Sequence, residues 1–362
     1  MISLAVVAVA AALVGEPVVP KSDEVFFGRV VVRAPAVASD ASLFVGDRRV
    51  ARRSVLARRV TFSLHGRPRR CDVRVRWERN GRVVGRSVAR RAWLLHSSAG
   101  QAIPERRRDR ALSARLGALG RAYLGYAAVW VHDLHTGRTA AWNSDASFPA
   151  ASIVKLAVLI AALDRFGPRP ERSAAWPDIR AMAAWSDNRA TNRLLVRLGG
   201  SEWAGSTIAQ RVLDRIGATS STFTGPYEVE PYADSDQPRP LPILAYRRTT
   251  AHDVGRILYA LHAAALGRPA AARRTGLSRH EARVGLALLL SSVRSGDNAG
   301  ILRPAGPAAQ KQGWTTNVRH TAAILYGTDG PEIVVVLTFR PDEVSYSASL
   351  AFGRRVLAVL RG

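Results

Sequence analysis

The stretch FPAASIVKL, residues 148–156, indicates both the fold and the chemistry of this chain. If a helix begins near Ser152, then Ser152 and Lys155 lie three positions apart on one helix face. Free backbone N–H groups in a first helical turn stabilise a developing anion. A buried lysine can lose its charge and accept the serine proton. The spacing therefore predicts a serine nucleophile beside an amine base, although ordinary helix starts also carry this pair of residues.

Lysine is rare in this chain, which makes each lysine informative. Lys and Arg total 53 among 362 residues, yet lysine occurs only at Lys21, Lys155 and Lys311. A bias toward arginine codons explains most of the arginines, but it does not explain positions that keep lysine. Arginine stays protonated in proteins, so only lysine can provide a neutral amine. We therefore expect chemistry at Lys155, whereas Lys311 needs only to be a cation and Lys21 has no such explanation.

Two further segments combine polar residues with a strand or helix start. Lys311 and Gly313 lie in AAQKQGWTT, at the start of a predicted strand, where glycine lets a ligand backbone approach closely. Ser186 and Asn188 lie in WSDNRATN, ahead of a predicted helix. There Ser186 can relay a proton and Asn188 can hydrogen-bond a substrate amide. Taken singly, an exposed strand end and a helix N-cap explain these segments more simply.

The composition is that of a globular protein with more than one domain. Hydrophobic residues make up 47% of the chain and charged residues 22%, which excludes a disordered or collagen-like protein. The length exceeds that of one average domain. Cys71 is the only cysteine, so no internal disulfide or cysteine-based metal cluster can form. His132 and His135 lie across a predicted strand end, so we expect no metal site and no cofactor.

The sequence predicts a signal peptide over residues 1–20, a small β-sandwich over 21–98 and a larger domain over 99–362. Residues 3–14 form an apolar run that is too short to span a bilayer but suits a signal-peptide core. Because no Lys or Arg precedes this run, a misassigned start or a buried strand is the alternative. Export would make this a secreted or bacterial cell-envelope protein.

The segment 22–97 consists of short β-rich runs, several of which alternate apolar residues with arginine, as half-buried strands do. Asn80-Gly81 between two runs predicts a tight hairpin, and five to seven strands form a sandwich. From 21 to 100, 18 arginines and Lys21 face six acidic residues. This surplus suits an anionic cell-wall polymer, although a solvated arginine-rich face is the alternative. No nucleic-acid-binding motif is present, so we expect no such partner, and we expect a monomer.

The rest of the chain predicts an α+β fold. A helical pattern covers residues 105–125, two strands follow over 126–143, and helices occupy about 150–218. Strands return near the end, before a final helix at 347–360. Strands near both ends therefore form one antiparallel sheet flanked by the terminal helices, and the middle of the chain forms an all-helical subdomain.

Three motifs occur in an order that is typical of one enzyme family: Ser-x-x-Lys at 152–155, Ser-Asp-Asn at 186–188 and Lys-x-Gly at 311–313. Over residues 105–361 the sequence resembles the penicillin-recognising serine enzymes, specifically class A β-lactamases and related serine hydrolases. The resemblance implies a β-lactamase-like fold and a small substrate, either a β-lactam or a mimic of the peptidoglycan stem.

The resemblance also implies a role for each motif residue. Ser152 attacks a β-lactam or acyl-D-Ala-type carbonyl to form an acyl-enzyme, which water then releases. Lys155 is the general base or proton shuttle, and Ser186 relays a proton to the leaving nitrogen. The backbone N–H groups of Ser152 and Trp314 form the implied oxyanion hole. The implied substrate-binding residues are Asn188, Lys311, Gly313, Trp314 and Thr315.

Two departures from the family pattern bear on turnover. Gln312 replaces a threonine, so a hydroxyl is lost unless Thr315 or Thr316 supplies one. No Glu-x-x-Leu-Asn follows Ser-Asp-Asn, and the class A glutamate that positions the deacylating water is therefore missing; Glu228 and Glu230 are weak candidates. The alternatives are a D-Ala-D-Ala peptidase or slow-deacylating penicillin-binding protein, and a non-catalytic wall-binding protein on the same scaffold.

Overall fold

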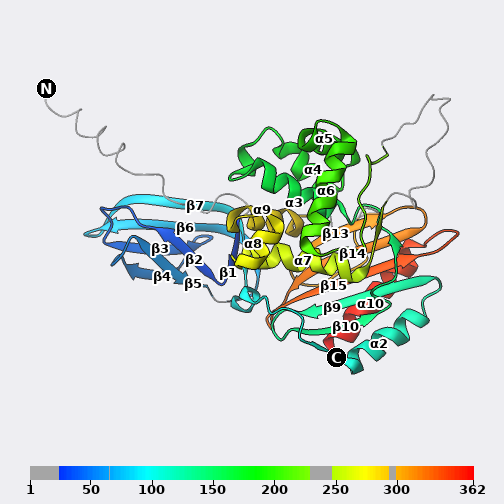
Figure 1. Cartoon of the computed structure of the whole chain (residues 1–362). Helices are drawn as coiled ribbons and strands as arrows, with labels where there is room; N and C mark the ends of the chain where they lie inside the picture. Colours follow the sequence, from blue (N-terminus) through cyan, green and yellow to red (C-terminus); the bar gives the residue numbers. More distant parts are fainter. Residues whose placement is uncertain (1–23, 65, 229–246, 293–298) are drawn as a thin grey trace. The chain divides into compact units, whose positions relative to one another are not determined.

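The computed structural model describes residues 24–64, 66–228, 247–292 and 299–362 (Figure 1). Contacts within the chain divide it into two compact units, with the boundary between Gly100 and Gln101. The predicted signal peptide, Lys21 and the deacylation candidate Glu230 lie outside the described residues.

The first unit is built mainly from β-strands. In chain order they are β1 (Val25–Phe27), β2 (Arg29–Arg33), β3 (Asp40–Val45), β4 (Arg48–Ser54), β5 (Arg59–Ser63), β6 (Arg69–Arg79) and β7 (Arg82–Leu95), followed by the 3-10 turn η1 (Ser97–Gly100). Within the described residues, one sheet has the order β1-β7-β6-β3-β4, and β2 pairs with β5 in a second. Adjacent strands are antiparallel except β1 and β7, which are parallel.

Alternation of apolar and polar residues explains why these segments form strands. In β2, Val30 and Val32 are buried, whereas the residues between and beside them are exposed. The buried side chains of both sheets share one core, to which Phe62 and Trp77 contribute the largest fully buried rings. The apolar face of each sheet is therefore covered by the other, which is the arrangement of a β-sandwich.

The turn between β6 and β7 confirms the predicted hairpin. Asn80 and Gly81 have φ angles of 48° and 75°. Two consecutive residues with positive φ form the tight turn whose twist matches that of the flanking strands. Arg79 and Arg82 face each other across it.

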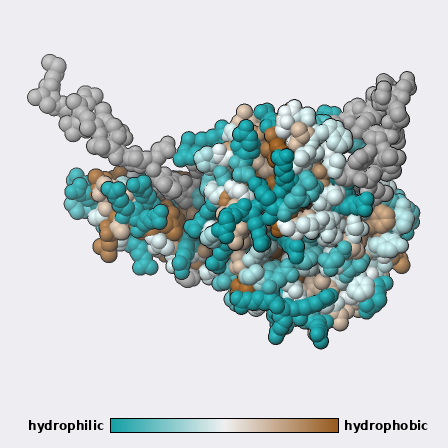
Figure 2. Space-filling model, in the orientation of Figure 1, coloured by the Kyte–Doolittle hydropathy of each residue, from teal (hydrophilic) through white to brown (hydrophobic). Residues whose placement is uncertain are grey.

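Arginine occupies many outward positions of this unit. The edge strand β4 exposes Arg48, Arg49, Arg52 and Arg53. Charged side chains on an edge strand discourage pairing with another chain. Figure 2 shows hydrophilic residues over most of the visible face, with hydrophobic residues in small groups between them.

The second unit contains a larger sheet built from both ends of its sequence. Its strands are β8 (Arg107–Arg108), β9 (Tyr126–Asp133), β10 (Arg138–Trp142), β13 (Ala308–Trp314), β14 (Val318–Tyr326) and β15 (Pro331–Phe339). In the part of the chain that the structure describes, they follow the order β13-β14-β15-β9-β10-β8 and are antiparallel except for the short β8. β13 is thus an edge of this sheet.

Helices cover both faces of this sheet (Figure 1). On one face α2 (Arg110–Arg121) and α10 (Tyr346–Arg361) bury Leu116 and Phe352 against apolar strand residues. On the other face α7 (Ala251–Ala265) packs Gly255 directly against the Trp130 ring. The remaining elements are β11 (Phe148–Pro149), α3 (Lys155–Phe166), η2 (Pro170–Arg172), α4 (Trp176–Trp185), α5 (Asn188–Gly199), α6 (Glu202–Ile216), β12 (Arg248–Thr249), α8 (Pro269–Thr275) and α9 (Arg279–Leu290).

The first helix is shorter than its sequence pattern predicted. The pattern covers residues 105–125, but α2 starts at Arg110 because the Asp109 side chain accepts a hydrogen bond from the Leu112 N–H at 2.9 Å. Such a capping carboxylate fixes the first turn of a helix. The predicted α+β fold, with its sheet, terminal helices and helical segment, is confirmed. Among the described residues, no helix combines the length and apolar character needed to cross a bilayer.

Candidate active site

Ser152 lies in a turn that leads into α3. The helix itself begins at Lys155, three residues later than the position predicted. The Lys155 N–H donates to the Ser152 carbonyl oxygen at 3.2 Å, so the two residues still belong to one turn of chain. Ala151 has a φ of 45°, a left-handed conformation that is costly for a residue with a side chain. Contacts from elsewhere in the fold must therefore hold this turn in place.

Those contacts come from β12 and from residues that precede it in the chain. β11 pairs with β12 in antiparallel register, and the Ala150 N–H donates to the Arg247 carbonyl oxygen at 3.0 Å. The Tyr227 hydroxyl donates to the Ala151 carbonyl oxygen at 3.2 Å. The turn that carries Ser152 is thus tied to residues about 75 to 100 positions later in the sequence.

The Lys155 amine is almost fully buried and has two acceptors. It donates to the Ser186 carbonyl oxygen and to Asn188 Oδ1, each at 2.6 Å. Burial lowers the pKa of this amine well below 10.5, and the charges of Lys311 and Arg247 lower it further, against a smaller opposing effect of Asp187. Two acceptors match the two N–H groups of a neutral amine, which leaves its lone pair free to accept a proton.

Ser186 joins the two buried lysines. It caps the end of α4 with a φ of 63°, and this left-handed conformation turns its carbonyl oxygen toward Lys155. Its hydroxyl oxygen accepts a hydrogen bond from Lys311 Nζ at 2.7 Å. Burial lowers the pKa of Lys311 from 10.5 to about 7. Lys311 also donates to the Gln312 carbonyl oxygen at 2.9 Å, so this buried amine has two acceptors.

Asn188 is the first residue of α5, and both ends of its amide are engaged. Oδ1 accepts from Lys155, and Nδ2 donates to the Glu228 carbonyl oxygen at 2.7 Å. The Glu228 side chain is exposed, so this deacylation candidate meets the site through its backbone rather than its carboxylate. A substrate amide would have to displace the Glu228 carbonyl to reach Asn188 Nδ2.

The third motif lies on β13 beside the serine turn. A Cβ atom at Gly313 would lie 2.8 Å from the Ile153 nitrogen and 3.0 Å from the Ser152 nitrogen, so glycine alone fits here. Trp314, at the end of β13, is 46% exposed and has the Arg319 guanidinium over its ring. The Thr315 hydroxyl accepts from the Asn317 N–H at 3.3 Å.

Three residues that the sequence analysis did not select also contribute to the site. Asn192 accepts from the Tyr227 N–H at 2.8 Å and donates to the Tyr227 carbonyl oxygen at 2.7 Å. The Tyr227 ring centre lies 4.2 Å from Lys155 Nζ and 3.8 Å from the Arg247 guanidinium carbon. The four-residue spacing from Asn188 to Asn192, which places both on one helix face, was the available signal.

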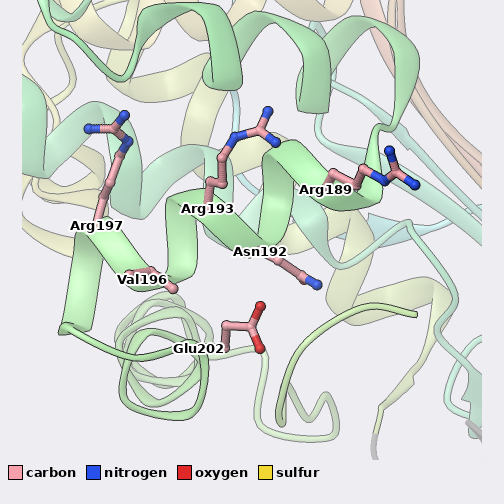
Figure 3. Close-up of a pocket in the computed structure, with 6 residues that line it drawn as sticks. All are labelled: Arg189, Asn192, Arg193, Val196, Arg197 and Glu202. Atoms are coloured by element: carbon pink, nitrogen blue, oxygen red, sulfur yellow. The ribbon is translucent and has the colours of Figure 1, made fainter. Parts of the chain in front are cut away.

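A surface hollow of about 490 Å³ lies beside α5, and Asn192 is one of the residues that line it. Figure 3 shows Arg189, Arg193 and Arg197 along this helix, with Glu202 of α6 across from them. Arg193 and Arg197 both pair with Asp178. The hollow does not include the two buried lysines. No cluster of three metal-ligating side chains occurs within the described ranges.

The sequence matches the model of the beta-lactamase enzyme family over residues 111–168 and 176–358. The chain belongs to this family. In this β-lactamase-family protein the match includes all three motifs and the strands β9, β10, β13, β14 and β15 of the sheet. None of the curated proteins compared with the chain matches it.

Solved structures similar to the chain share its fold. PBP-A is 18% identical, with a TM-score of 0.54, and covers 71% of this chain and 98% of its own. A class A β-lactamase from Mycobacterium abscessus is 20% identical, with a TM-score of 0.53 over 69% and 100% of the two chains. A β-lactamase from Desulfarculus baarsii is 23% identical, with a TM-score of 0.51 over 70% and 97%. These likenesses show the fold and confirm the predicted α+β architecture.

Proposed function

We propose that this protein is a serine hydrolase that forms an acyl-enzyme on Ser152 with a β-lactam or a related amide. The observation that carries the proposal is the buried amine of Lys155, which belongs to the Ser152 turn and has acceptors for only two N–H groups. Its lowered pKa favours the neutral form that can remove the serine proton. Arginine could not perform this step.

The other motif residues support the later events of acylation. Lys155 takes the Ser152 proton as the serine oxygen attacks the carbonyl carbon. The backbone N–H groups of Ser152 and Trp314 are the proposed donors to the resulting oxyanion. Ser186 then passes a proton to the leaving nitrogen, with Lys311 as its hydrogen-bond partner. A substrate carboxylate beside Lys311 raises the pKa of this amine and keeps it charged.

Penicillins are the appropriate first probes. A point mutant of the structural neighbour PBP-A is described as an acyl-enzyme complex with penicillin G. Slow release of the acyl group is the form of the activity that we favour for this protein. Release needs a base that activates water. Glu228 is exposed and meets the site through its backbone, and the Lys155 amine hydrogen-bonds only neutral groups among the described residues, so no carboxylate is bonded there to activate water. A D-Ala-D-Ala peptidase would share the same acylation step.

Intact-protein mass spectrometry after penicillin treatment, together with a nitrocefin assay, tests the proposal. The expected result is a mass increase equal to one penicillin, lost in Ser152→Ala and kept in Ser147→Ala. Ser147 is a suitable control because it is an exposed serine five residues before the nucleophile. A mass increase that survives in Ser152→Ala would contradict the assignment of the nucleophile, and an unmodified wild type that leaves nitrocefin intact would contradict the activity.

We further propose that the first unit provides the contact with an anionic cell-wall polymer, because arginines occupy its outward strand positions. Export to the cell envelope belongs to the same proposal. Deletion of residues 22–97 should then abolish co-sedimentation with purified cell walls, while Ser152→Ala should leave it intact. Equal sedimentation of the truncated and full-length proteins would contradict this role. Loss of sedimentation by deletion, with no measurable property lost in Ser152→Ala, would instead indicate a non-catalytic binding protein.

A further inference from the structure

Tyr227 contacts the amine that we propose as the general base. Its ring centre is 4.2 Å from Lys155 Nζ. A water hydrogen-bonded to the amine needs about 2.8 Å, and contact of that water with the ring needs about 3.5 Å more. The 4.2 Å from Lys155 Nζ to the ring centre is shorter than the sum of these two distances. The side of the Lys155 amine that faces the ring therefore has no room for water.

Tyr227 is held in this position from several directions. Its backbone N–H and carbonyl both bond to the Asn192 amide, and its hydroxyl bonds to the Ala151 carbonyl oxygen. The Arg247 guanidinium lies against the ring, and it also donates to the carbonyl oxygens of Gly225 and Pro226 in the same loop. The side chain is 7% exposed. Tyr227 is thus a fixed wall of the site rather than a mobile lid.

Release of an acyl-enzyme by hydrolysis requires a water molecule within hydrogen-bond reach of a base. Water adds to the ester carbonyl carbon, a base takes one of its protons, and the bond from that carbon to the Ser152 oxygen breaks. The serine oxygen regains a proton and the acyl group leaves as a carboxylic acid. Lys155 is the proposed base of the serine turn, and Asn188 and Ser186 already accept hydrogen bonds from its N–H groups.

We propose that Tyr227 is a positioning residue that prolongs the acyl-enzyme, because it keeps water away from the Lys155 amine beside Ser152. The inference rests on the proposed function, since it concerns the second half of that reaction. Slow release is then caused by Tyr227 and the loop that carries it. Acylation does not need this water, so the ring of Tyr227 should act on release. The Tyr227 hydroxyl bonds to the Ala151 carbonyl oxygen of the serine turn, and its effect is measured separately with Tyr227→Phe.

The test measures two rate constants by mass spectrometry with penicillin G as the probe: formation of the adduct on Ser152 and its release after excess penicillin is removed. Tyr227→Ala should accelerate release about tenfold or more, because a general base contributes factors of this order or larger once it can reach water. Tyr227→Phe keeps the ring and removes only the hydroxyl, so its release rate should match the wild type. Formation of the adduct should change less than about threefold in Tyr227→Phe, since the proposed base keeps its surroundings.

Phe223→Ala is the matched control for a loosened loop. Phe223 packs edge-on against Tyr227, with ring centres 5.9 Å apart, and also lies near Arg247. It makes no ring contact with Lys155. Release should therefore remain slow in Phe223→Ala. If loop loosening were the whole effect of Tyr227→Ala, then Phe223→Ala would accelerate release equally, and the proposal would be overturned.

Tyr227→Glu provides a second variant in case Tyr227→Ala fails to fold. A carboxylate there can both admit and orient a water, so release should accelerate by about a hundredfold. Rapid release in the wild type, or release from a folded Tyr227→Glu at the wild-type rate, would overturn the inference while the adduct itself still supports the proposed function. Absence of any adduct on the wild type would instead overturn both.

Discussion

The buried Lys311 amine should make the stability of this protein increase with pH. The perturbation that reveals this is Lys311→Met, which keeps an unbranched chain of similar length and removes the charge. Burial lowers the pKa of Lys311 from 10.5 to about 7 in the folded protein. The unfolded chain keeps the ordinary value, so between these two pKa values the unfolded state binds more protons. The free energy of unfolding therefore rises as pH rises through this window.

The size of the effect follows from the two pKa values. At pH 7 about half of the folded molecules carry a neutral Lys311, while the unfolded chain is protonated. At about pH 9 the folded form is neutral and the unfolded chain is still mostly protonated. Each pKa unit of difference corresponds to about 1.4 kcal/mol. The contribution of Lys311 to the free energy of unfolding should therefore increase by about 2 kcal/mol from about pH 7 to pH 9.

Urea denaturation at about pH 7, 8 and 9 measures this difference. Tryptophan fluorescence is a suitable signal because most tryptophans lie in the second unit: Trp130, Trp142, Trp176, Trp185, Trp203 and Trp314. Lys311→Met should be the more stable protein at about pH 7, and its advantage over the wild type should shrink by about 2 kcal/mol by pH 9. Arg354→Met removes an exposed charge from α10 and should show no such change. A constant difference between wild type and Lys311→Met across this range would refute the reasoning.

Two further predictions concern the serine turn. The rate of penicillin labelling should rise with pH through the lowered pKa of Lys155, because only the neutral amine accepts the Ser152 proton; Lys155→Arg should abolish labelling at every pH, and labelling of this variant would contradict the role of the amine. Gly313→Ala should slow labelling and destabilise the fold by about 1–3 kcal/mol, because its Cβ would lie 3.0 Å from the Ser152 nitrogen. Gly327→Ala is the control in thermal unfolding, since the nearest atom to its Cβ is 3.8 Å away and it should be near neutral.

The fold could be predicted because its signals are local. Alternation of apolar residues marked the strands, and Asn80-Gly81 marked a hairpin whose φ angles require those residue types. The scarcity of lysine drew attention to Lys155 and Lys311, and the structure connects both to Ser186 by hydrogen bonds. The catalytic roles of these residues remain predictions.

Tyr227 and Arg247 could not be predicted in the same way. They are 20 positions apart in the sequence and meet each other and Lys155 only through the tertiary fold. Arg247 is one of many arginines, so its residue type carried no signal, and the loop that holds Tyr227 has no periodic pattern. The start of α3 was also misplaced, because Ser152 is a good helix-cap residue but here belongs to a turn held by residues far along the chain.

The position of β13 at the edge of its sheet has a consequence for self-association. An edge strand offers unpaired backbone groups to any extended chain, including a second copy of the same protein. Six of the seven residues of β13 are buried, so the chain's own packing covers most of this edge, and its last residue, the exposed Trp314, is the part open to a second copy. The Arg319 guanidinium lies over that ring and places a positive charge at the opening. Repulsion between such charges on two copies is screened by salt, so this protein should be easier to keep dispersed in dilute buffer than at high ionic strength.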